Sequence, residues 1–81
     1  MAESWIVLKA DSVEIENMSL RNEEGAARYT AKGDAKVLVR QGEASLSYEL
    51  QKGDVVYVMD AVVHIPTKLA ERRIRQGPFN P

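Results

Sequence analysis

Apolar and polar residues alternate along much of the chain with a period of two, which is typical of a β-strand covered on one face. The alternation is strictest over residues 43–50, where the inward positions are Ala44, Leu46, Tyr48 and Leu50. Residues 4–10 are apolar on both faces, which indicates a strand that is covered on both sides. Altogether the pattern predicts strands over residues 4–10, 13–20, 27–31, 36–40, 43–50, 55–59 and 62–66.

Short polar segments separate these runs. Turns are predicted at Lys32-Gly33-Asp34, Gln41-Gly42 and Lys52-Gly53-Asp54, because glycine beside a polar residue favours chain reversal. Asn17 is predicted to form a β-bulge, since the inward apolar positions change from odd to even numbers after it. Pro66 lacks a backbone donor and therefore ends the last strand or places it at an edge.

Roughly seven or eight short strands with frequent turns predict an all-β fold, a small antiparallel barrel or sandwich. Residues 1–76 are expected to form one domain, and residues 77–81 an extended C-terminal tail. Residues 67–76 fit either a short C-terminal helix, which their composition favours, or a polar edge strand.

Length limits the stability of such a domain. A chain of 81 residues buries only about 60–65% of the surface that its unfolded form exposes. Small domains compensate with disulfides, a metal or oligomerisation. The chain has no cysteine and one histidine, so a partner chain is the expected source of additional stability.

Charged residues interrupt the first twenty positions, and no apolar run approaches the roughly 18–20 residues of a membrane span. We therefore expect a soluble protein of the cytoplasm, or of a particle assembled there.

The charges are unevenly distributed although the net charge is only −1. Residues 1–24 hold two basic and six acidic side chains, whereas residues 65–81 hold four basic and one acidic. The two ends could attract each other between neighbouring subunits of a ring, or both could be solvated surfaces.

Residues 53–64 resemble the second sequence motif of the cupin superfamily: glycine, five residues, proline, one residue, glycine, two residues, histidine, three residues and asparagine. Gly53 and His64 match this spacing, whereas Met59, Ala61 and Lys68 stand at the proline, second glycine and asparagine positions. The resemblance extends over residues 36–68 and implies a cupin-like barrel.

The departures from the cupin pattern imply a metal-free protein with no cofactor. Cupin metal sites use three histidines and a glutamate, and here Ala35 stands at the glutamate position and His64 is the one histidine.

A metal-free relative could bind a sugar-type small molecule, or act as an isomerase or epimerase through an acid–base pair. The candidates for that pair are His64, Tyr48, Tyr57 and Asp60. Two other interpretations place His64 at a strand end with its ring nitrogens satisfied by backbone or water, or in a subunit interface where its protonation would modulate assembly.

A basic cluster near the end of the chain supports a third possibility. Phosphate contacts to nucleic acid would use Lys68, Arg72, Arg73 and Arg75, repeated once per subunit in an oligomer. A subunit-pairing role fits the same cluster.

The leading hypothesis is a non-catalytic, self-associating β-module with a structural role, such as a component of a ring or a larger particle. The short chain without disulfides, the two-sided apolar strands and the charge asymmetry all favour it. Trp5 and Phe79 are the expected interface anchors.

Overall fold

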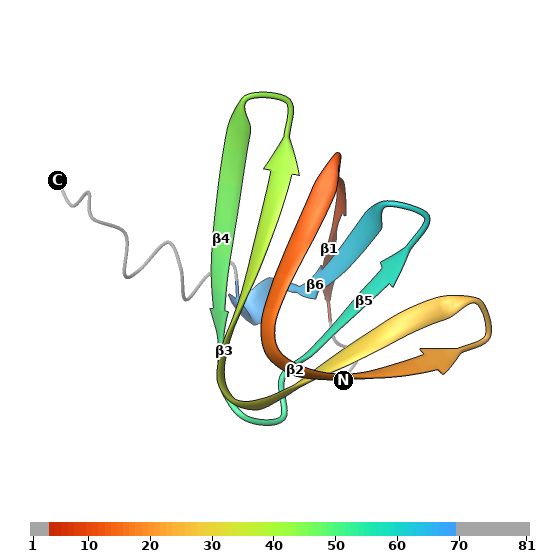
Figure 1. Cartoon of the computed structure of the whole chain (residues 1–81), viewed down its shortest axis with the longest axis vertical. Coiled ribbons are helices and arrows are strands. Elements are labelled where there is room, and N and C mark those ends of the chain that lie inside the picture. The colour runs from red at the N-terminus through yellow and green to blue at the C-terminus, as the bar shows by residue number, and fades with distance from the viewer. Residues whose placement is uncertain (1–3, 70–81) are drawn as a thin grey trace, which may run out of the picture.

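Six antiparallel strands form one sheet in the computed structural model, which describes residues 4–69 (Figure 1). The strand order is β1-β6-β5-β3-β2, and β4 also pairs with β3. The all-β prediction is therefore confirmed. The strands are β1 (Trp5–Lys9), β2 (Ser12–Glu23), β3 (Ala26–Gln41), β4 (Ala44–Leu50), β5 (Val55–Met59) and β6 (Val62–Pro66).

Strand β3 is the centre of this arrangement. It pairs with β2 along one side, while its other side pairs first with β5, through residues 27–30, and then with β4, through residues 35–41. The sheet thus has a five-strand lobe (β1, β6, β5 and the adjoining halves of β3 and β2) and a three-strand lobe (β4 and the remaining halves). Both β2 and β3 bend where the lobes join (Figure 1).

The bend is built from the predicted bulge. The pairing register of β2 with β3 shifts between Glu16 and Met18, and Asn17 has a positive φ of 63°. Asparagine tolerates this left-handed conformation better than most residues. Its Nδ2 also donates a hydrogen bond of 2.9 Å to the backbone oxygen of Asp34 on β3.

The turn predicted at Lys32-Gly33-Asp34 is wrong, because these residues lie within β3. Gly33 faces the bulge, and a Cβ built on it would lie 3.6 Å from Asn17 Nδ2. Gly33 therefore lies at a bend between the two lobes, and the chain does not reverse there. Residues 27–31 and 36–40 form one strand, which is why the described chain has six strands instead of seven or eight.

The predicted barrel is not closed. Within residues 4–69, β1 and β2 are the two ends of the strand order and do not pair with each other. Strand β4 also has β3 as its one partner. The sheet bends without forming a continuous ring of strands.

Residues 67–69 are helical, which decides between helix and strand for these three positions. Residues 70–76 lie outside the described residues.

The inner face of the sheet carries a small aliphatic core. Three alanines, Leu50 and Tyr48 complete the buried set. The largest fully buried side chains are Ile65, Leu69, Val37, Val39, Val56 and Val63.

The turn between β5 and β6 consists of Asp60 and Ala61, both with positive φ, at 49° and 65°. Two-residue hairpins with this backbone strongly favour glycine, because a Cβ in the left-handed region meets the following carbonyl. Ala61 occupies the position of the second glycine in the motif that residues 53–64 resemble. The turn therefore holds local strain at Ala61.

We expect Ala61→Gly to raise the free energy of unfolding by about 1 kcal/mol, since glycine adopts this φ without the Cβ penalty. Urea denaturation measures the change. Ala44→Gly, the same substitution in the regular strand β4, should instead lower stability by roughly 0.5–1 kcal/mol. Equal losses in the two variants would contradict a strained turn.

Candidate functional site

The outer face of strands β1, β5 and β6 is largely apolar, with Lys9 as its one charged side chain, although the inner face of the same strands already carries the core. On β3 and β2 the same face continues into the charged side chains Arg28, Arg21 and Glu23. Neighbouring side chains along a strand point to opposite faces, so the buried Val56 and Val63 place their neighbours outside. We call the resulting surface the outer apolar face. It consists of Trp5, Val7, Tyr57, Met59, Val62 and His64.

Three members of this face are exposed: Trp5 to 37%, Val7 to 59% and Met59 to 41%. Trp5 meets the ring of Tyr57 edge-on, with 5.5 Å between ring centroids and an interplanar angle of 61°. This geometry is a favourable one for an aromatic pair. The sequence predicted two apolar faces for residues 4–10, and the structure extends that property to β5 and β6.

The outer apolar face is hollowed by two adjoining pockets. One, of about 280 Å³, is lined by Trp5, Ala26, Tyr57, Met59 and His64. The other, of about 630 Å³, shares Ala26, Tyr57 and Met59 with it and ends at Glu23 and Glu24. Because the pockets share lining residues, they form one groove, with an aromatic end on β1 and an acidic end beside the β2–β3 turn. We call it the outer groove.

His64 lies in the middle of β6 and not at a strand end. It stands opposite Val7 on one side and Tyr57 on the other. The strand-end position of the sequence interpretation is therefore wrong, and the Nδ1 of His64 is buried with no hydrogen-bond partner among residues 4–69.

Arg28 of β3 stands opposite Tyr57 of β5. Its Nε is also buried and has no hydrogen-bond partner among residues 4–69. Two unsatisfied polar atoms therefore lie under one apolar surface, which is unfavourable for the isolated chain.

The four acid–base candidates do not converge. Tyr57 and His64 are cross-strand neighbours on the outer face. Tyr48 is buried on the inner face, in the core, and Asp60 is exposed in the β5–β6 turn. Tyr57 and His64, which do lie together, are on the outer face of the sheet. The active site of a cupin-like barrel is expected on the inner face.

The basic cluster is described at one position. The Nζ of Lys68 lies 3.6 Å from Oδ1 of Asp54 across the end of the sheet. The other predicted binding residues, Arg72, Arg73 and Arg75, and the predicted anchor Phe79 lie outside the described residues.

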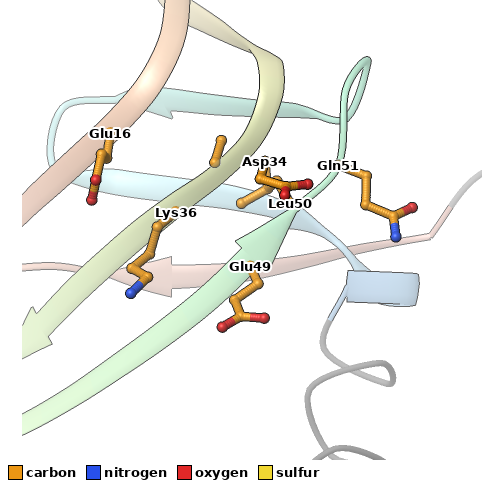
Figure 2. A pocket seen from close by; sticks show the side chains of 7 residues that line it. Glu16, Asp34, Lys36, Glu49, Leu50 and Gln51 are labelled. Atoms are coloured by element: carbon orange, nitrogen blue, oxygen red, sulfur yellow. The ribbon is translucent and has the colours of Figure 1, made fainter.

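A second surface feature, which the sequence did not indicate, is a pocket of about 350 Å³ at the bend between the lobes (Figure 2). Lys36 of β3 stands between Glu16 of β2 and Glu49 of β4 in the strand register. Asp34 and Gln51 complete its polar rim. Within residues 4–69, no three acidic or histidine side chains are grouped so that they could hold a metal ion.

No family model, curated protein or solved structure matches this chain. The cupin resemblance of residues 53–64 therefore stays a prediction. Among residues 4–69 there is no helix with the length and apolar character to cross a membrane.

We expect His64→Leu to leave the free energy of unfolding unchanged or to raise it by about 1 kcal/mol, since leucine removes a buried nitrogen without a partner. Urea denaturation at equal protein concentrations measures it. Tyr57→Leu is the matched control and should lose about 1 kcal/mol with the Trp5 ring contact. A clear loss of stability in His64→Leu would show that the imidazole makes a stabilising hydrogen bond.

Proposed function

We propose that this protein is a non-catalytic, self-associating β-module with a structural role, and that copies assemble through the outer apolar face. The observation that carries the proposal is an apolar surface on both sides of β1, β5 and β6. The inner side supplies the core of the subunit, and the outer side has no cover among residues 4–69.

Because the core is small, a neighbour that covers the outer apolar face would add to the stability of the subunit. The fully buried side chains are mostly valines, and alanines fill much of the remaining core. Burying apolar surface contributes roughly 25 cal/mol per Å². A neighbour that covers Trp5, Val7 and Met59 would therefore add stabilisation that a chain of this length gains with difficulty from its own interior.

The strand edges favour the same side of the molecule. Strands β1, β2 and β4 each have an edge without a strand partner in the described chain. Alternating glutamates and Arg21 occur along β2, and charges on an edge strand oppose pairing with another chain. Strands β1 and β4 each carry one charge, Lys9 and Glu49, and of these two strands β1 borders the outer apolar face. Association is therefore favoured at β1 and its adjoining face.

A structural role agrees with the placement of the candidate catalytic residues. Tyr48 is in the core and Asp60 is in a turn, so of the four candidates Tyr57 and His64 line the outer groove, as neighbours on adjacent strands. In self-association the same two side chains act as part of the contact surface. A ring or a component of a larger particle fits this use.

We expect the native mass of the purified protein at micromolar concentration to be a multiple of the chain mass. Met59→Lys should shift it to the monomer, because the ammonium group would have to be desolvated in the contact. Sedimentation velocity measures both.

Leu20→Lys is the matched control. Leu20 is 55% exposed, but its row across the sheet runs through Tyr29 to the buried Val56, on the inner side. This variant should keep the wild-type mass. A folded, stable wild-type monomer at micromolar concentration would contradict self-association.

A further inference from the structure

We infer that residues 70–81 of a neighbouring copy occupy the outer groove, with Phe79 in the pocket beside Trp5. The inference rests on the proposed self-association and specifies which part of the neighbour makes the contact. Three observations carry it: the chemistry of the pocket, the charges, and the position of Leu69.

The pocket beside Trp5 suits an aromatic side chain. It is lined by three rings, those of Trp5, Tyr57 and His64, and by the side chains of Ala26 and Met59. Phe79 is the one phenylalanine of the chain and stands in Gly77-Pro78-Phe79-Asn80-Pro81. Proline-containing segments dock in aromatic-lined grooves with a small entropy cost, because proline restricts the backbone in advance.

The charges are complementary. Residues 4–69 contain eight basic and ten acidic side chains, whereas residues 70–81 contain three arginines and one glutamate. Glu23 and Glu24 line the far end of the outer groove. The Glu23 carboxylate lies 3.5 Å from Arg28 and 3.7 Å from Arg21 and is therefore already paired, so Glu24 is the carboxylate at this end that an arginine of the neighbour would meet.

The spacing fits this placement. Three strand spacings separate β6 from β2 in the order β6-β5-β3-β2, a distance of about 14 Å at roughly 4.8 Å per spacing. Arg75 precedes Phe79 by four residues, which span at most about 14 Å when extended. A segment crossing the strands with Phe79 over β6 and β5 therefore brings Arg75 to the acidic end of the outer groove.

The position of Leu69 favours a neighbouring copy over the same chain. Leu69 is 1% exposed and packs into the core on the inner face, opposite the outer groove. The Thr67 amide donates a 3.0 Å hydrogen bond to the Ser4 backbone oxygen, which fixes the start of the helical residues against the β1 end. Leu69, the last described residue, thus lies on the opposite side of the sheet from the groove of its own subunit.

Such a contact joins two different surfaces, because residues 70–81 of one copy bind the outer groove of the next copy. Repetition of a heterologous contact closes a ring or extends a filament, depending on the rotation between copies. A face-to-face dimer of two outer apolar faces would not need residues 70–81.

The test uses the full-length chain with Phe79→Ala, and Asn80→Ala as the matched control in the same segment. We expect Phe79→Ala to raise the dissociation constant at least tenfold and to move Trp5 emission to longer wavelength, since Trp5 loses its cover. Asn80→Ala should behave as wild type. Trp5 is the one tryptophan, so the emission reports directly on this pocket.

A charge exchange adds a second measurement. Arg75→Glu should weaken association, and Glu24→Arg in the same chain should restore part of it. A synthetic peptide of residues 70–81, added to the Phe79→Ala protein, should return Trp5 emission towards that of the wild-type assembly.

The outcomes separate the two proposals. If Phe79→Ala keeps the wild-type mass and emission while Met59→Lys dissociates, the segment does not fill the outer groove, although self-association stands. If the wild-type protein is monomeric and Phe79→Ala alters Trp5 emission, the segment binds its own chain, and the neighbour contact is overturned together with self-association.

Discussion

The structure depends on one continuous sixteen-residue strand, β3, that has to serve two lobes of the sheet. A regular strand of this length would direct both lobes along one twisted plane. The bulge at Asn17, its hydrogen bond to the Asp34 oxygen and the glycine opposite it allow β2 and β3 to bend together without losing their pairing on either side. The bend lets the inner faces of both lobes contribute to one core, with Val37 and Val39 from one lobe and Val56 and Val63 from the other.

The bend also leaves one surface without cover among residues 4–69. Strands β1, β6 and β5 extend the lobe away from β4, and their inner side chains complete the core while Trp5, Val7 and Met59 point outwards. The side chains of this outer surface include two buried polar atoms, on His64 and Arg28, that have no hydrogen-bond partner in the described part of the chain. An apolar face with unsatisfied groups beneath it is a poor final surface for a small subunit in water, which is the physical basis for proposing that another copy covers it.

The sequence was sufficient for the fold class, the bulge at Asn17 and the turns at Lys52-Gly53-Asp54 and, one residue later than predicted, after Gln41, because each of these has a local chemical cause. It failed at Lys32-Gly33-Asp34, where glycine serves a bend that depends on a distant residue, Asn17. The site was predictable only in part: Trp5 was an expected anchor, but the groove it shares with Met59 and Ala26 arises from strand register, which alternation alone does not give. The strand register also places His64 and Tyr57 on the outer surface, whereas Tyr48 lies in the core.

Access of solvent to Trp5 is the property that follows most directly from this account. Acrylamide quenching of Trp5 fluorescence, in the unmodified protein at micromolar concentration and in Met59→Lys at the same concentration, measures that access. We expect a clearly smaller quenching constant for the unmodified protein, because a neighbouring copy covers the outer apolar face. Equal quenching constants for the two proteins would show that the face is open to water and would contradict assembly through it.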